Sequence, residues 1–291
     1  MASVEYMTTH GHHQHGHDNH NGHSHGAGLA ESLTLDALIL GTYLEQATAL
    51  AAELTPTPGV IIDAGSGSGV GAVALAQRFE NTHIIALDKS ADMLGQTLEA
   101  ASKNGLTGQV TTVLADLDEA WPEVAAADLI WASSSLHEVA DPERSMGEMF
   151  AGLNAGGLLM VIEMDGLPCF LSAATLADGT ELAALEARLH AALAQMRWNH
   201  HPDWRAGLER AGFDVVEQRS YTAVGNSTPD LASRYARMFL ERIRTAMDDV
   251  ATAADLAILD SLLASDGPES LASRTDLQVR GSRTVWAARK P

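Results

Sequence analysis

A glycine-rich loop at residues 63–69, with the sequence DAGSGSG, is the first stretch whose residue types could serve chemistry. It follows the apolar run VII at 60–62, which is typical of a buried strand, and precedes a stretch of helical character at 69–79. Its glycines permit a tight turn and let backbone N–H groups approach a ligand closely. The N–H groups at the start of the following helix add free donors. The loop therefore indicates a cofactor-binding turn.

Three kinds of cofactor loop compete for this stretch. A nucleoside-triphosphate loop needs a Gly-Lys-Ser/Thr sequence, and residues 60–88 contain no lysine, so this alternative fails. The nicotinamide fingerprint G-x-G-x-x-G/A fits only at Gly67, Gly69 and Ala72, several residues past the strand, where the tight turn should already be complete. The third alternative is a D-x-G-x-G-x-G loop, with Asp63 at the end of the strand.

Acidic residues close the next two expected strands. Asp88 ends HIIALD at 83–88, where a carboxylate can accept hydrogen bonds from a ribose diol, as it would also for a nicotinamide cofactor. Asp116 ends QVTTVLAD at 109–116, where it can accept from an adenine amino group. A strand, a serine-rich turn, a helix, an LNAGG turn and another strand follow. This series, over about residues 59–164, strongly resembles the core of class I S-adenosylmethionine-dependent methyltransferases of the small-molecule type.

The resemblance implies a cofactor and a set of residues that hold it. S-adenosylmethionine carries no phosphate, and its cationic sulfonium and ammonium groups suit an acidic loop. The loop and the turn after the fourth strand would meet the methionine moiety, the acid at 88 the ribose, and the residues around 89, 93 and 116 the adenine. The implied cofactor-binding residues are Asp63, Gly65, Ser66, Gly67, Gly69, Asp88, Lys89, Met93, Asp116, Leu117, Ser133 and Ser134.

Methyl transfer is an in-line displacement that needs alignment and, for some acceptors, a base. His137, in SSSLHEVAD directly after the fourth expected strand, is the best-placed base, with a hydrogen-bonded structural role as the alternative. Glu163, near the end of the fifth strand, is the second catalytic candidate. The cluster RWNHHPDW at 197–204 predicts a substrate wall, a metal site, or a linker that anchors helices on the core. The candidate substrate residues are Tyr43, Trp198, His200, His201 and Trp204.

Residues 1–28 form a separate histidine-rich segment, with eight histidines between residues 10 and 26 and no apolar periodicity. Such a composition cannot form a core and predicts disorder. Neutral imidazoles at this density bind divalent metals, so the tail is a candidate metal binder or sensor, unless it is only a solvated leader or an appended purification sequence. The candidate metal ligands are His12, His13, His15 and His17.

The remaining chain predicts an α/β protein with a doubly wound, mainly parallel sheet, because strand-like and helix-like stretches alternate. The resemblance adds that the sheet has seven strands, the last antiparallel. A helix is expected at 29–56, the cofactor-binding core at 57–166, a helical insertion at 167–203, and the last two strands within 204–291, interrupted by helices at 228–266. We expect the inserted helices to form a lid over one edge of the sheet.

Composition narrows the function classes. The net charge of -20 disfavours nucleic acid and anionic lipid as partners. The sequence has no apolar run long enough for a membrane span and no secretory signal, and the single Cys169 is consistent with a reducing cytoplasm. We therefore expect a cytoplasmic enzyme that methylates an O, N or C atom of a small molecule. The alternatives are a methyltransferase-like metal sensor and a nicotinamide-dependent oxidoreductase. The oligomeric state stays open, with a homodimer as one option.

Overall fold

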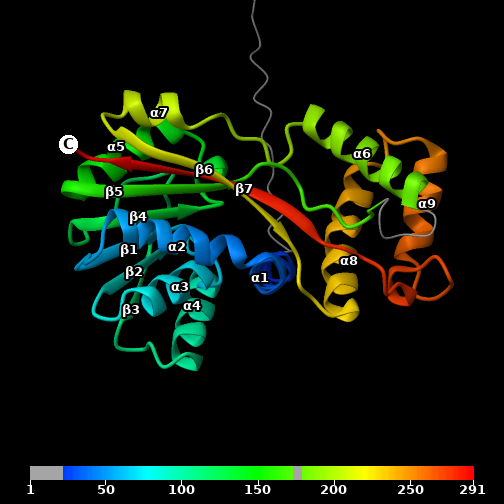
Figure 1. Cartoon of the computed structure of the whole chain (residues 1–291), viewed down its shortest axis with the longest axis horizontal. Helices are drawn as coiled ribbons and strands as arrows, with labels where there is room; N and C mark the ends of the chain where they lie inside the picture. Colours follow the sequence, from blue (N-terminus) through cyan, green and yellow to red (C-terminus); the bar gives the residue numbers. More distant parts are fainter. Residues whose placement is uncertain (1–21, 173–178) are drawn as a thin grey trace, which may run out of the picture.

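One seven-stranded sheet organises the molecule, with the strand order β3-β2-β1-β4-β5-β7-β6 (Figure 1). The computed structural model describes residues 22–172 and 179–291. Strands β1 to β5 run parallel, whereas β7 is antiparallel to both of its neighbours. The expected α/β sheet with an antiparallel last strand is confirmed. The strands are β1 (Val60–Ala64), β2 (His83–Asp88), β3 (Val110–Leu114), β4 (Ala127–Ser133), β5 (Leu153–Met164), β6 (Asp214–Val224) and β7 (Arg280–Arg289).

The chain direction across the sheet reverses between β1 and β4, which lie side by side although β2 and β3 separate them in sequence. The connections from β1 lead to one side of the sheet, and those from β4 lead to the other. Such a switch point opens a crevice at the carboxyl ends of the strands, where ligands bind in open α/β sheets. The glycine-rich loop at 63–69 begins at this place.

Helices cover both faces of the sheet because its strands bury apolar side chains on both sides. One face packs against α2 (Thr42–Leu54), α3 (Val70–Arg78) and α4 (Ala91–Lys103) through residues such as Ile61 and Leu75. The opposite face packs against α5 (Pro142–Gly152) and α7 (Arg205–Arg210) through residues such as Ile62 and Met149. These elements match the expected helices within a few residues.

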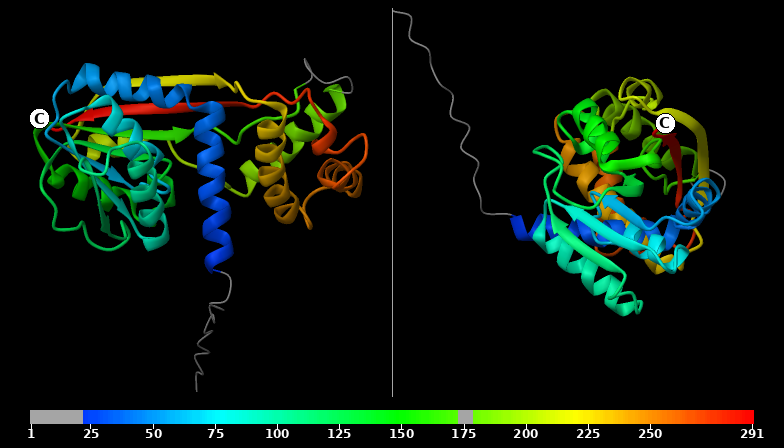
Figure 2. Two further views of the ribbon diagram at one scale, coloured as in Figure 1. Left: turned by 90° about the horizontal axis from the view of Figure 1, so that it is seen from below. Right: turned by 90° about the vertical axis from the view of Figure 1, so that its left-hand side faces the viewer.

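The N-terminal region differs from its prediction. Helix α1 (Gly22–Leu40) begins inside the segment expected to be disordered, and the single helix expected at 29–56 is two helices. The chain turns sharply at Gly41, so that α1 and α2 run in different directions (Figure 2). A Cβ atom at this position would lie 2.1 Å from the carbonyl oxygen of Ala37, so the turn requires glycine.

The inserted helices α6 (Gly179–Gln195), α8 (Pro229–Ala246) and α9 (Ala253–Leu263) form a lobe beyond the carboxyl ends of the parallel strands (Figure 1). Together with α1 they enclose an apolar core of their own, which includes Leu185, Tyr235 and Leu259. The lobe therefore faces the ligand-binding end of the sheet, rather than only one edge as expected. Two short 3-10 turns, η1 (Leu136–Glu138) and η2 (Leu271–Ser273), complete the fold. In the part of the chain described, no helix is long and apolar enough to span a membrane.

A buried polar cluster joins the lobe to the sheet. Asp36 on α1 accepts hydrogen bonds from the hydroxyl of Tyr235 on α8 (2.7 Å) and from Nη2 of Arg283 on β7 (2.6 Å). The guanidinium of Arg283 stacks on the ring of Tyr43, with its central carbon 4.4 Å from the ring centre. These contacts hold three helices and one strand together, so they fix the position of the lobe relative to the sheet.

Candidate active site

The glycine-rich loop is packed closely between its neighbours. Gly65, Gly67 and Gly69 adopt left-handed φ angles of 77°, 52° and 84°. A Cβ atom at Gly65 would lie 2.5 Å from the Cβ of Ser135, and one at Gly69 would lie 2.7 Å from the Cα of Thr97. Both the backbone conformation and the space therefore exclude larger residues at these two positions.

Asp88 holds the loop against the end of β2. Its Oδ2 accepts a hydrogen bond from the backbone N–H of Gly67 (2.9 Å), and its Oδ1 accepts one from Ser90 (2.8 Å). Each carboxylate oxygen has a second lone pair, so the same side chain can still accept from a ribose hydroxyl. Asp88 thus orders the turn and keeps the accepting capacity that the sequence predicted for it.

Asp63 does not face the crevice, contrary to the expectation that it meets a cationic ligand. It lies on the same face of β1 as Ile61, is only 2% exposed, and accepts a hydrogen bond from the backbone of Ala72 in the first turn of α3. Burial raises the pKa of Asp63 to about 7, although the Ala72 N–H opposes this shift. Strand alternation turns the side chain inward, and the N-terminus of α3 stabilises it there.

Two serine hydroxyls in the loop have unused hydrogen-bonding capacity. Ser66 and Ser68 are 8% and 7% exposed, and neither Oγ atom has a partner among the described residues. Buried hydroxyls without partners are unfavourable, so a polar ligand bound at the loop would stabilise them. Together with the closely packed glycines and Asp88, these hydroxyls fit a polar nucleoside-type cofactor.

The other residues implied for the cofactor gather around this crevice with different exposures. Met93 is buried in α4, whereas Lys89 is exposed before that helix. Asp116 follows β3 and accepts from the backbone N–H of Asp118 (3.0 Å), and the carbonyl of Leu117 accepts from Arg144 (2.8 Å). All four residues lie at or just after the carboxyl ends of β2 and β3, as the sequence predicted.

The turn after β4 contributes the last two implied cofactor residues. Ser134 has a left-handed φ of 52°, and its N–H donates to the carbonyl of Ile162 (2.8 Å). Ser133 forms a hydrogen bond with the hydroxyl of Tyr43. The left-handed conformation is unusual for serine and indicates a turn that the surrounding structure enforces.

His137 and Glu163, the two catalytic candidates, contact each other directly. The imidazole Nδ1 of His137 lies 2.7 Å from Oε2 of Glu163, and the His137 backbone N–H lies 3.3 Å from Oε1. Glu163 is fully buried, whereas the imidazole is 10% exposed. The chain brings these residues together from two strand ends that are 26 positions apart.

A second carboxylate, that of Glu138, favours the charged form of His137. Nε2 of His137 lies 3.2 Å from Oε1 of the exposed Glu138. Burial of the imidazole disfavours its charged form, but the hydrogen bonds and charges of Glu138 and Glu163 outweigh burial and raise the pKa of His137 to about 9. The imidazole is therefore a cation at neutral pH and donates from both nitrogens.

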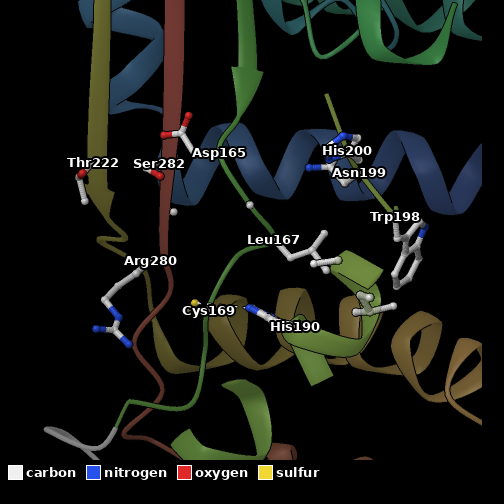
Figure 3. Close-up of a pocket in the computed structure, with 14 residues that line it drawn as sticks. Asp165, Leu167, Cys169, His190, Trp198, Asn199, His200, Thr222, Arg280 and Ser282 are labelled. Atoms are coloured by element: carbon white, nitrogen blue, oxygen red, sulfur yellow. Dashed lines mark hydrogen bonds between the residues drawn. The ribbon is translucent and has the colours of Figure 1, made fainter. Parts of the chain in front are cut away.

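A cavity of about 620 Å³ lies between the sheet and the lobe (Figure 3). Its wall includes Asp165, which follows Glu163 by two residues, whereas neither Glu163 nor His137 is among the lining residues. The volume suits a small-molecule ligand. The lining residues are Asp165, Gly166, Leu167, Cys169, His190, Leu193, Ala194, Trp198, Asn199, His200, Thr222, Arg280, Gly281 and Ser282.

The five candidate substrate residues divide into two groups. Trp198 and His200 line the cavity. His201 instead stacks on Trp204, and its Nε2 lies 2.9 Å from the carbonyl oxygen of Met164, while Trp204 is only 4% exposed. Tyr43 is buried beneath Arg283 and lies outside the cavity. His201, Trp204 and Tyr43 therefore take part in packing. Contrary to the expectation, they do not line the cavity.

Several polar residues of the cavity were not identified from the sequence, among them Asp165, His190 and Arg280. Asp165 follows the carboxyl end of β5, a position that commonly faces the ligand, and this signal was available. His190 lies on α6 near Cys169, with 4.0 Å between its Nδ1 and the cysteine Sγ. Burial lowers the pKa of His190, so this side chain is neutral at physiological pH. Arg280 begins β7, and no local sequence pattern distinguishes it.

The expected metal ligands of the histidine-rich tail, His12, His13, His15 and His17, lie outside the described residues. Within residues 22–172 and 179–291, no group of three or more histidine, cysteine or acidic side chains is arranged to hold a metal ion. The cluster at 197–204 is therefore not a metal site in the described part of the chain.

Comparison with known proteins agrees with this geometry. Residues 58–222 match the family model of the methyltransferase domain. A malonyl-[acyl-carrier protein] O-methyltransferase from Methylovorus is 32% identical over 106 residues, which are 35% of this chain and 36% of that enzyme. A trans-aconitate 2-methyltransferase from Acidovorax is 36% identical over 112 residues, 38% of this chain and 41% of that enzyme. The similarity thus spans well under half the length of these curated relatives.

The solved structures extend the likeness of fold over most of the chain. A Bacillus halodurans protein assigned as a methyltransferase superposes with a TM-score of 0.52 at 18% sequence identity. The match covers 84% of this chain and 98% of that protein. The sheet order and the family match point to the same conclusion. This chain belongs to the class I methyltransferase family, with its Rossmann-like fold.

Proposed function

We propose that this protein transfers the methyl group of S-adenosylmethionine to an O, N or C atom of a small molecule. When bound, this cofactor supplies an electrophilic methyl group on a sulfonium sulfur. An acceptor would take this methyl group as the sulfur–methyl bond breaks, S-adenosylhomocysteine would leave, and a protic acceptor would lose one proton. The protein's task is to align the two molecules and to receive or direct that proton.

Residues of the glycine loop and of the neighbouring strand ends would bind the cofactor. Asp88 would accept from the ribose, and the hydroxyls of Ser66 and Ser68, which have no partner among the described residues, would offer hydrogen bonds near the glycine turn. Ser133 and Ser134 lie beside this turn at the end of β4 and would border the methionine end. Asp63 contributes indirectly, because it anchors the first turn of α3 from inside the protein.

The observation that carries the proposal is the adjacency of three features at the carboxyl ends of the strands. The glycine loop leaves β1, the His137–Glu163 pair joins the ends of β4 and β5, and the cavity begins at Asp165. A methyl donor at the loop and an acceptor in the cavity would therefore meet beside His137. An acceptor that displaces the exposed Glu138 from Nε2 would receive a hydrogen bond from the protonated imidazole, which becomes a base when Nε2 loses its proton.

Ligand-dependent thermal melting tests the proposal. S-adenosylhomocysteine should raise the melting temperature, because a ligand that binds only the folded state stabilises it. NADH and NADPH should leave it unchanged at the same concentration. Stabilisation by a nicotinamide cofactor without stabilisation by S-adenosylhomocysteine would favour the oxidoreductase alternative instead.

A further inference from the structure

Arg280, in the wall of the cavity, carries a positive charge that no side chain among the described residues pairs with. Its backbone is fixed by two hydrogen bonds with Cys169, of 2.8 and 2.9 Å. Its guanidinium forms no hydrogen bond or ion pair with any residue of the described part of the chain, and the Nε atom is buried without an acceptor. A buried N–H donor that lacks an acceptor is unfavourable, so a ligand that supplies one gains affinity there.

Glu186 is the acidic residue whose pKa responds to the charge of Arg280, but its carboxylate is hydrogen-bonded to other groups. Burial raises the pKa of Glu186, and the positive charge of Arg280 partly opposes this shift. The carboxylate of Glu186 accepts hydrogen bonds from the backbone N–H groups of Phe170 (2.7 Å) and Leu171 (3.2 Å). Glu186 therefore does not neutralise Arg280 through a direct contact.

The cavity wall carries charges of both signs, from Asp165 and Arg280. Arg280, Ser282 and Thr284 alternate along β7 and face the same side of the sheet. Thr284 lies opposite Glu163 in the strand register, and its hydroxyl donates to Asp165 (2.5 Å). The backbone N–H of Asp165 donates to the carbonyl of Ser282 (3.1 Å), so Asp165 lies beside a residue two positions from Arg280. Glu163 and Thr284 lie four positions from Arg280 along β7, roughly 14 Å at about 3.4 Å per residue. An anionic group is thus disfavoured beside the carboxylate of Asp165 and attracted to Arg280.

The wall between these charges is largely apolar. Leu167, Leu193 and Trp198 line it. Figure 3 shows Trp198 on the opposite side from Thr222 and Ser282. Trp198 stands between Arg197 and Asn199, two non-glycine residues with left-handed φ angles of 58° and 50°. Such conformations persist only where the surrounding structure enforces them, and they cluster at ligand sites. Within the described residues, Arg280 is the one cationic side chain of the cavity wall, so a monoanion matches it better than a dianion.

We propose that the cavity binds an acceptor molecule with an apolar body and a carboxylate, and that Arg280 holds this carboxylate at the end remote from methyl transfer. The planar guanidinium matches a carboxylate through two parallel hydrogen bonds. The body of the acceptor lies along Leu193 and Trp198, and the atom to be methylated points toward His137 and Glu163. This inference rests on the proposed function, because it takes the cavity as the acceptor site.

Isothermal titration with a matched pair of compounds tests the inference. The probes are 6-phenylhexanoate and the neutral 6-phenylhexanamide, which share an apolar body and differ in charge. The full-length protein should bind the carboxylate about tenfold more tightly than the amide, since charge-assisted hydrogen bonds are the stronger ones. Arg280→Gln should abolish this preference, and Arg280→Lys should retain part of it. Arg219→Gln, on the exposed strand β6, is the matched control and should leave the preference unchanged.

The inference is overturned if the wild-type protein binds both compounds equally, if it binds neither at millimolar concentration, or if Arg280→Gln keeps the preference. S-adenosylhomocysteine titrated into the same proteins separates this result from the proposed function. We expect its affinity to be the same in wild type and Arg280→Gln. A carboxylate preference that depends on Arg280 in a protein that does not bind S-adenosylhomocysteine would support the anion site and contradict the proposed function.

Discussion

The imidazole of His137 lies between two carboxylates, and the fully buried Glu163 is the one that fixes its position, with 2.7 Å between Nδ1 and Oε2. The exposed Glu138 contacts the other nitrogen from the solvent side. Because one partner is held by the sheet and the other stands at the surface, the two acids have separable roles. Glu163 orients the ring, and Glu138 controls how readily Nε2 gives up its proton.

Glu138→Gln should lower the pKa of His137 from about 9 toward its ordinary value, because a negative charge beside the imidazolium is removed. NMR titration of the His137 ring measures this without knowledge of the acceptor. The pH limb of methyl transfer that requires neutral His137 should move to lower pH in parallel. Glu143→Gln, a surface variant whose carboxylate pairs with Arg210, should leave the titration unchanged. An unaltered pKa in Glu138→Gln would show that this contact does not set the charge of the ring.

Glu163→Gln tests the orienting role. The change keeps the shape of the side chain but removes the charge behind Nδ1, so the pKa of His137 should again fall. If His137 accepts or donates a proton during methyl transfer, the turnover number should decrease by about 10²-fold or more. A positioned general acid or base usually contributes a rate factor of this size. The dissociation constant for S-adenosylhomocysteine should stay the same. Turnover equal to wild type would assign the pair a structural role.

The glycine loop predicts a difference between two Gly→Ala variants with similar backbone conformations. Gly69 and Gly105 both have left-handed φ angles, 84° and 74°, but only Gly69 has atoms close to the position of a Cβ. Gly105→Ala should cost about 1 kcal/mol of unfolding free energy from backbone strain alone. Gly69→Ala should cost roughly 1–3 kcal/mol more through overpacking against Thr97. Denaturant unfolding measures both, and equal losses would contradict the close packing of the loop.

The buried cluster at Asp36 should be important for stability. Asp36→Ala leaves Arg283 buried without its carboxylate partner, which costs about 3–5 kcal/mol for a broken buried pair. Glu31→Ala on the same helix removes only a surface ion pair with Arg234, which costs at most about 1 kcal/mol. Chemical denaturation of the two variants gives the comparison. A loss in Asp36→Ala no larger than in Glu31→Ala would show that Arg283 finds another partner.

The sheet could be predicted from the sequence because its signals are local. Apolar runs such as residues 60–62 mark buried strands, and the order of strands and helices restricts the topology. The break at Gly41 was missed because apolar periodicity continues through it, and only the collision with Ala37 shows why the helix must end. Strand alternation predicts that Asp63 points inward with Ile61. The resemblance of the motif implied instead that Asp63 faces the ligand.

The candidate site could be predicted only in part. Its cofactor side consists of residues that directly follow strands, so the positions of Asp88 and Asp116 were predictable. The cavity depends on tertiary packing of the lobe, which brings His190 on α6 toward Arg280 on β7, 90 positions later in the chain. No local pattern relates these two residues. The composition of the cluster at 197–204 made all of its aromatic residues candidates. In the fold, Trp198 lines the cavity, whereas His201 packs against Trp204.

Calorimetric titration of S-adenosylhomocysteine into the wild-type protein, Asp88→Ala and the control Glu99→Ala tests the central claim most directly. Asp88 contacts the loop, whereas Glu99 lies on the exposed side of α4 and pairs with Lys103. We predict one binding site in wild type, unchanged affinity in Glu99→Ala, and affinity weaker by about tenfold or more in a folded Asp88→Ala protein, which loses charge-assisted hydrogen bonds. Absence of binding to wild type, or equal affinity in Asp88→Ala, would contradict the methyl-donor site at this loop.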